Sequence, residues 1–134
     1  MTDLENAKKV LESGCTCAIC LDKTVYTSTD RGVTPLLRFL DDGTDLMGYS
    51  AADKIVGCAA AMLYCLLGVR RVYGKVMSVG AVKILRAQGI ETSWGTLAET
   101  ILNQTKLAPC PMERALKDVD DPDEGLEIIR SMLQ

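Results

Sequence analysis

The order of apolar and polar positions predicts short helices and strands in the first third of the chain. Apolar residues recur at helical spacing over 3–13, and a second helix begins at Thr34-Pro35, where proline takes the first helical position. Between them, the runs 15–21 and 24–27 favour extended structure. They are separated only by Asp22-Lys23, which is typical of a β-hairpin.

The rest of the chain alternates strand and helix patterns. One segment stands out because it is apolar on every side, as in a helix that is buried all round. The expected elements are a strand over 46–49, this buried helix over 55–67, a strand over 69–76, a helix over 79–88, a strand over 90–94, a helix from Thr96 to about Gln104, a helix start at Cys110 and a final amphipathic helix after 120–124.

Strands that alternate with helices indicate a largely parallel sheet covered on both faces. With the hairpin added at one side, the prediction is a three-layer α/β/α fold with a mixed sheet. No internal repeat or linker interrupts the pattern, so residues 1–134 are expected to form one domain.

Composition narrows the range of partners. The formal net charge is −3 and no basic cluster stands out, which argues against nucleic acid as a partner. The apolar run 55–67 is too short to cross a membrane, and the N-terminus has no signal-peptide pattern. Six cysteines in a chain of this size favour free thiols, so we expect a cytoplasmic protein. The partner that we expect is a small molecule.

The stretch from Ser50 to Gly57 is the first candidate site, because it places Asp53 and Lys54 at the mouth of the buried helix. Ser50 and Asp53 have the spacing of a reciprocal helix cap, which is one interpretation. Lys54 has no such explanation, since a lysine opposes the dipole at a helix start unless an anion lies nearby. Gly57 allows close packing of a strand or admits a ligand.

The second candidate is the helix start at Cys110-Pro111, with Glu113 in its first turn. Backbone N–H groups there favour a thiolate at Cys110, whereas the carboxylate of Glu113 disfavours it. The chain has no histidine to act as a base, so a plain cap and a reactive thiol both stay open. Ser78 is a third candidate: it caps a helix after a strand, and its hydroxyl and neighbouring N–H groups suit an anion.

Three motifs resemble one uncharacterised prokaryotic family, the domain of unknown function 1893 of the cytidine-deaminase-like superfamily. They are Asp30-Arg31-Gly32-Val33, Asp53-Lys54-Ile55-Val56-Gly57 and Pro109-Cys110-Pro111-Met112-Glu113, and the likeness runs from about Gly14 to Val119. The resemblance implies the fold and no assigned activity. Superfamily members also make a homo-oligomer plausible, through the helices that cover the sheet.

Zinc deaminases hold their metal with a His or Cys before one helix and a Cys-x-x-Cys before the next, beside a catalytic glutamate. The matching places here read Ala52-Asp53-Lys54 and Met77-Ser78-Val79-Gly80. Because these residues supply no such ligands, we expect no metal, no other cofactor and no deamination by zinc hydroxide.

The leading hypothesis is therefore a protein that binds a small polar ligand: a nucleoside, a base or a phosphate-bearing metabolite. Lys54 and the N–H groups near Ser78 would meet an anionic or carbonyl group, Asp53 would accept a hydrogen bond, and Gly57 and Glu113 would line the site. One alternative is a metal-free enzyme that uses Cys110 as nucleophile, or Asp53 and Lys54 as an acid–base pair. Another is a non-catalytic oligomerising or regulatory protein.

Overall fold

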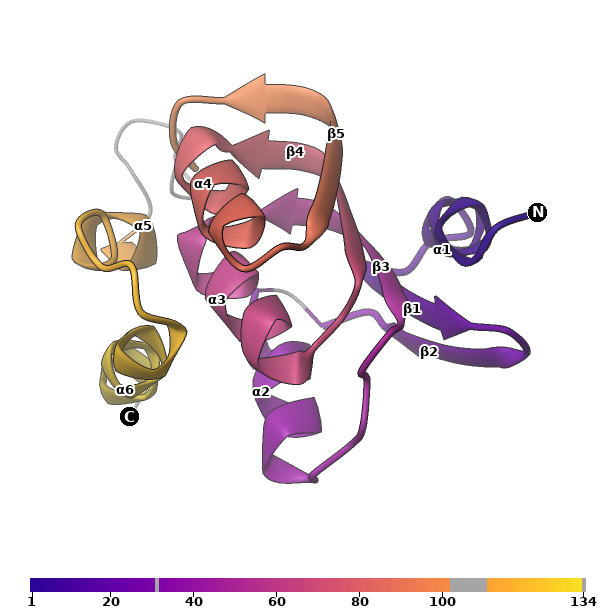
Figure 1. The fold of residues 1–134 in the computed structure, drawn as a ribbon, viewed down its shortest axis with the longest axis horizontal. Coiled ribbons are helices and arrows are strands. Elements are labelled where there is room, and N and C mark those ends of the chain that lie inside the picture. The colour runs from indigo at the N-terminus through magenta and orange to yellow at the C-terminus, as the bar shows by residue number, and fades with distance from the viewer. Residues whose placement is uncertain (31, 102–110, 134) are drawn as a thin grey trace.

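The computed structural model describes residues 1–30, 32–101 and 111–133, and its centre is one mixed five-stranded sheet (Figure 1). The strands run β2-β1-β3-β4-β5 across the sheet. β1 pairs antiparallel with both β2 and β3, whereas β3, β4 and β5 are parallel neighbours. The predicted mixed α/β fold with a hairpin at one side is thus confirmed. The strands are β1 (Cys17–Leu21), β2 (Thr24–Ser28), β3 (Ser50–Val56), β4 (Arg71–Ser78) and β5 (Glu91–Ala98).

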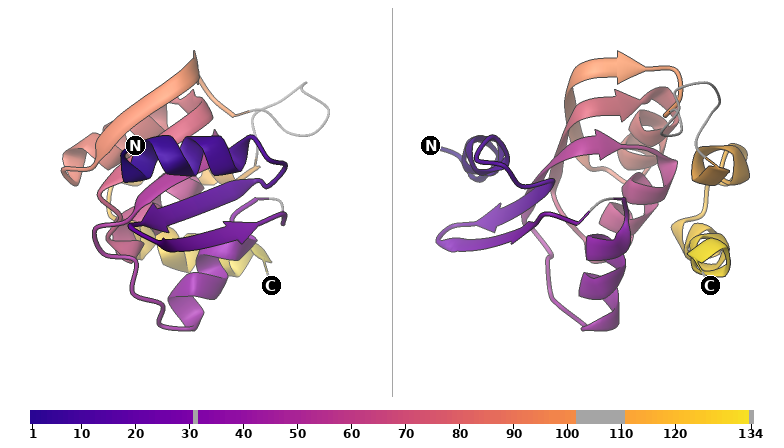
Figure 2. Two further views of the ribbon diagram at one scale, coloured as in Figure 1. Left: turned by 90° about the vertical axis from the view of Figure 1, so that its right-hand side faces the viewer. Right: turned by 180° about the vertical axis from the view of Figure 1, so that it is seen from behind.

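Helices cover both faces of this sheet, which gives three layers (Figures 1 and 2). One face carries α1, and the other carries α2, α3 and α4. Two further helices, α5 and α6, pack against α3 on the side away from the sheet. The helices are α1 (Asp3–Leu11), α2 (Thr34–Asp41), α3 (Cys58–Leu67), α4 (Val79–Ala87), α5 (Pro111–Ala115) and α6 (Pro122–Leu133). None of them combines the length and hydropathy needed to cross a bilayer.

The main core surrounds α3, as its all-round apolar composition predicts. Met62, Leu63 and Tyr64 on this helix are completely buried, together with Ile19 and Val72 on the strands beneath it. The helix ends at Gly68, whose φ of 78° is the left-handed conformation that favours glycine at a helix C-terminus. α3 is therefore packed on all sides, and it begins at the carboxyl end of β3.

The opposite face of the sheet carries a smaller core under α1. Ala7 and Leu11 of α1 pack on Ala18, Cys20 and Ala52 of the strands. Small side chains on both sides let the helix lie close to β1 and β3. α1 ends above β3, so its last turn lies beside the outward-facing residues of β3 and β4.

The sequence predictions around β3 were wrong in three respects. Residues 46–49 form a turn, and the strand runs from Ser50 to Val56 instead. The buried helix consequently begins at Cys58, three residues later than predicted. Ser50 is not a helix cap: it lies in the strand, opposite Cys20 of β1 and Arg71 of β4. Pairing on both sides of β3 outweighs the local capping pattern.

The prediction of a helix that begins at Thr96 was also wrong, because the structure has a strand there. Thr96, Leu97 and Ala98 continue β5 alongside Val76, Met77 and Ser78 of β4. The capping-box spacing at Thr96 is overridden because these residues complete a ladder with a strand already in place. Residues 102–104 of the predicted helix lie outside the described residues.

Candidate functional site

Asp53 and Lys54 are neighbours in β3, and the structure separates their side chains. Successive residues of a strand point to opposite faces of a sheet. Asp53 faces α3, where it contacts Tyr64, whereas Lys54 faces α1. The proposed acid–base pair is therefore corrected, since the two groups do not share a site.

Asp53 belongs to a partly buried polar cluster between β1, β3 and α3. The Tyr64 hydroxyl donates a hydrogen bond of 2.7 Å to its carboxylate, and the N–H of Ile55 donates another at 3.3 Å. The Cys17 thiol lies 3.4 Å from the same hydroxyl. Burial raises the pKa of Asp53 to about 6, although both hydrogen bonds lower it.

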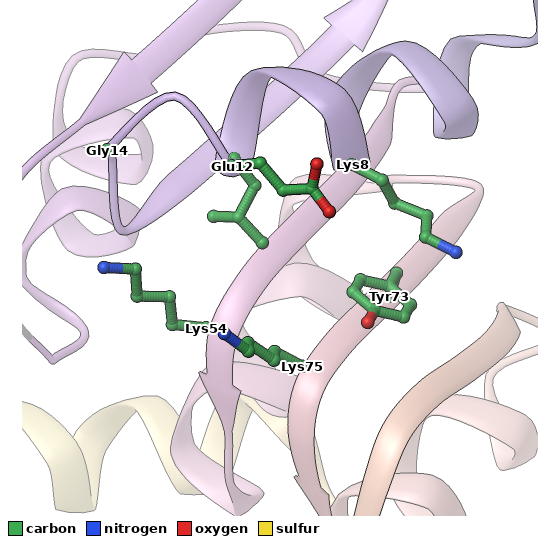
Figure 3. Close-up of a pocket in the computed structure, with 7 residues that line it drawn as sticks. Lys8, Glu12, Gly14, Lys54, Tyr73 and Lys75 are labelled. Atoms are coloured by element: carbon green, nitrogen blue, oxygen red, sulfur yellow. The ribbon is translucent and has the colours of Figure 1, made fainter.

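Lys54 lines a pocket of about 280 Å³ between α1 and the sheet, which we call the lysine pocket (Figure 3). Lysines from three separate elements line it: Lys8 of α1, Lys54 of β3 and Lys75 of β4. The Lys8 ammonium lies 4.3 Å from the centre of the Tyr73 ring. The remaining lining residues are Leu11, Glu12 and Gly14.

The charges of this pocket are unbalanced, because its lining residues include three lysines and a single carboxylate, that of Glu12. Asp53 pairs with Gly74 and Ile55 pairs with Val76, so Lys54 and Lys75 stand beside each other on neighbouring strands. Like charges in such a position destabilise a sheet. Sequence analysis singled out Lys54 and missed Lys8 and Lys75, which only the strand register and α1 bring close.

Three other predicted ligand-binding residues gather elsewhere, at the start of α3. Glu113 of α5 is buried, and its carboxylate accepts hydrogen bonds from the N–H of Cys58 and from the N–H of Ile101 at 3.3 Å. A Cβ atom added to Gly57 would lie 2.6 Å from this carboxylate. Ser78 caps α4, accepting from the N–H of Ala81 at 3.1 Å. We call Gly57, Cys58, Ser78 and Glu113 the Glu113 cluster.

The Glu113 cluster is internally satisfied. The carboxylate of Glu113 lies where an anionic ligand would otherwise meet the first N–H groups of α3. Burial and this carboxylate together raise the pKa of the Cys58 thiol to about 12, so the thiol is neutral at physiological pH. Cys110 lies outside the described residues, and its predicted role as a nucleophile stays a prediction.

A second hollow, of about 370 Å³, lies next to this cluster. It is lined by Cys58 and Gly80 and carries Lys83, Lys117 and Asp120. Its charges are more nearly balanced than those of the lysine pocket. Within the described residues, no three Cys, Asp or Glu side chains lie close enough together to hold a metal ion.

Fold and pocket thus define a small α/β protein with a mixed sheet and a lysine-lined pocket under its first helix. The chain belongs to the DUF1893 family, a domain of unknown function whose family model matches residues 6–133. No curated protein matches the sequence.

Solved structures are similar to different degrees. A DUF1893 family protein from Thermotoga maritima superposes with a TM-score of 0.90 at 25% identity, over 98% of this chain and 91% of that one. A diaminohydroxyphosphoribosylaminopyrimidine deaminase/reductase from the same organism has a TM-score of 0.45 at 14% identity, over 69% of this chain and 35% of that chain. A dCMP deaminase from cyanophage S-TIM5 also has a TM-score of 0.45, at 12% identity, over 68% of this chain and 92% of that one. The likeness to deaminases is loose and carries no argument about chemistry.

Proposed function

We propose that this protein binds a small metabolite with two or more negative charges, such as a phosphate-bearing compound, in the lysine pocket. The observation that carries the proposal is the placement of Lys54 beside Lys75, in a pocket that Lys8 of α1 also lines. Three ammonium groups against one carboxylate suit a ligand whose own charge exceeds one. The pocket volume of about 280 Å³ suits a compact metabolite.

The walls of the pocket support an extension to nucleotides. Tyr73 and Leu11 offer an aromatic ring and an apolar side chain beside the lysines. The Tyr73 ring is occupied by the Lys8 ammonium, an arrangement that a nucleobase would replace by stacking. Lys8 would then turn its charge toward the phosphate groups.

Binding rather than catalysis is the activity proposed here. The neutral Cys58 thiol and the separation of Asp53 from Lys54 both favour a binding role over nucleophilic or acid–base chemistry at these residues. Deamination through zinc forms no part of the proposal.

The test is calorimetric titration of nucleoside mono-, di- and triphosphates, with inorganic diphosphate as a probe of the charges alone. We expect Lys54→Ala and Lys75→Ala each to weaken binding about tenfold or more, because each removes a charge-assisted contact. Lys54→Arg should keep most of the affinity. Lys23→Ala, an exposed lysine outside the pocket, is the matched control. Equal affinity in wild type and Lys54→Ala, or no binding by wild type, would contradict the proposal.

A further inference from the structure

The sheet has two edges, and they differ in how well they are protected. β2 is an edge strand of five residues that follows Asp22-Lys23. β5 is the other edge and has eight residues, Glu91 being the only charged one. Natural proteins protect long edges with lysines, prolines or covering segments. Among the described residues, no strand pairs with β5 on the side away from β4.

Hydrogen bonding shows which groups of β5 face outward. The N–H of Glu91 donates a hydrogen bond of 3.1 Å to the carbonyl of Arg70, so the backbone N–H and C=O groups of Glu91 are directed toward β4. The register continues regularly to Trp94, which lies opposite Gly74. Because N–H and C=O groups alternate in direction along a strand, those of Thr92 and Trp94 point to the free edge.

We propose that β5 is the interface with a second copy of this chain, which pairs antiparallel and continues the sheet. A two-fold axis at Ser93 places Thr92 opposite Trp94 of the second copy, so the outward N–H and C=O groups of both residues find partners. The occupant that fits this edge is therefore the strand itself in the opposite direction.

The side chains agree with this self-pairing. Glu91 lies opposite Gly95 of the second copy, so no two like charges meet. Glu91 is moreover already paired with Arg71 in its own chain. Trp94, partly exposed and the chain's single tryptophan, is placed next to Thr92 of the second copy, a pairing of aromatic and β-branched side chains that sheets favour. The interface differs from the one predicted from sequence, which used the helices that cover the sheet.

Sedimentation and light scattering of the full chain at micromolar concentration test the interface. We expect a mass twice the 14.5 kDa of one chain, and a Trp94 fluorescence maximum that moves to longer wavelength on dilution. Thr92→Pro removes an outward N–H that β4 does not use, and should give a monomer. Thr92→Ala keeps that N–H and should remain a dimer.

Opposite charges placed at residue 93, on the two-fold axis, test the proposed register. Ser93→Lys and Ser93→Glu should each give monomers, because residue 93 faces its own copy. A mixture of the two variants should restore the dimer. This test stands even if Thr92→Pro fails to fold, with circular dichroism as the check on both Ser93 variants. A monomeric wild type, dimers that persist in all variants, or a mixture that stays monomeric would each overturn the proposal.

Discussion

The lysine pocket and the Glu113 cluster lie on opposite sides of the sheet and treat charge in opposite ways. In the Glu113 cluster, the buried carboxylate of Glu113 accepts hydrogen bonds from the N–H of Cys58 at the start of α3 and from the N–H of Ile101. Its charge is therefore stabilised by groups of the chain itself. In the lysine pocket, Lys54 and Lys75 stand side by side with one glutamate to balance them and Lys8. The comparison teaches that a conspicuous residue at a helix start can be structural, whereas the excess of lysines on the sheet has no such internal partner among the residues that line the pocket.

Replacing Glu113 should have the largest effect on stability. Glu113→Ala leaves the buried N–H of Cys58 and the partly buried N–H of Ile101 without their acceptor, which costs about 2–4 kcal/mol of unfolding free energy. Urea denaturation followed by circular dichroism measures the loss. Glu113→Gln keeps one acceptor oxygen and should lose less.

The same variants sharpen the contrast between the two regions. Diphosphate affinity at the lysine pocket should be unchanged in Glu113→Gln, because no residue of the Glu113 cluster lines that pocket. A Glu113→Gln protein that is fully folded yet binds diphosphate much more weakly would show that the ligand site includes the start of α3.

Gly57 should be the next most sensitive position. A Cβ at residue 57 would lie 2.6 Å from Oε1 of Glu113 and 3.1 Å from Cγ1 of Ile101, so Gly57→Ala forces Glu113 to move and costs about 1–3 kcal/mol. A double-mutant cycle provides the control. The cost of Gly57→Ala should fall clearly in a Glu113→Ala background, because the closest clash is gone. Equal costs in both backgrounds would mean that the crowding lies elsewhere.

The layered α/β fold could be predicted from sequence because its signals are local. The apolar helix that ends at Gly68, the hairpin at Asp22-Lys23 and the serine cap at Ser78 each depend on residues close together in the chain. Predictions failed where pairing between distant segments decides the structure. Ser50 and Thr96 carry capping patterns, yet both lie in strands because a neighbouring strand pairs with them.

The candidate site was harder to predict for the same reason. Lys54 was predicted as a site residue because a lysine at a helix start opposes the helix dipole, but Lys54 lies in β3 and not in a helix. Its proposed role now depends on Lys75 and Lys8, which are 21 and 46 residues away in the numbering and line the same pocket through β-pairing and the packing of α1. Gly57, Ser78 and Glu113 were predicted to bind a ligand. The structure places them near one another, and the Glu113 carboxylate there accepts hydrogen bonds from N–H groups of the chain itself.

Asp53 offers a test between these two extremes, because it is a half-buried acid that accepts hydrogen bonds and has no salt bridge to a described residue. Its pKa of about 6 lies above the ordinary 3.8, so the folded protein holds this proton more tightly than the unfolded chain. The resulting stabilisation is complete below about pH 4 and is lost as the pH rises to about 6. Asp53→Asn keeps an acceptor for the Tyr64 hydroxyl without the charge, and should stabilise the protein by about 1–2 kcal/mol at neutral pH.

Urea denaturation of wild type and Asp53→Asn across this pH range measures the effect. The gain from Asp53→Asn should be small in acid and should reach its full value above the pKa of Asp53. A gain that is the same at every pH would show that burial does not perturb this carboxyl. Asp53→Ala is the control that loses the acceptor as well.

The smallest effect is expected at the lysine pocket itself, in the absence of ligand. Lys75→Ala removes one of two like charges on neighbouring strands and should stabilise the free protein by about 0.2–1 kcal/mol. With diphosphate present, wild type should become more stable than Lys75→Ala, because a ligand stabilises the protein that binds it more tightly. Thermal unfolding with and without diphosphate, beside Lys23→Ala, makes the comparison. If Lys75→Ala is destabilised without ligand and responds to diphosphate like wild type, Lys75 serves the fold and the charges of this pocket are not a binding site.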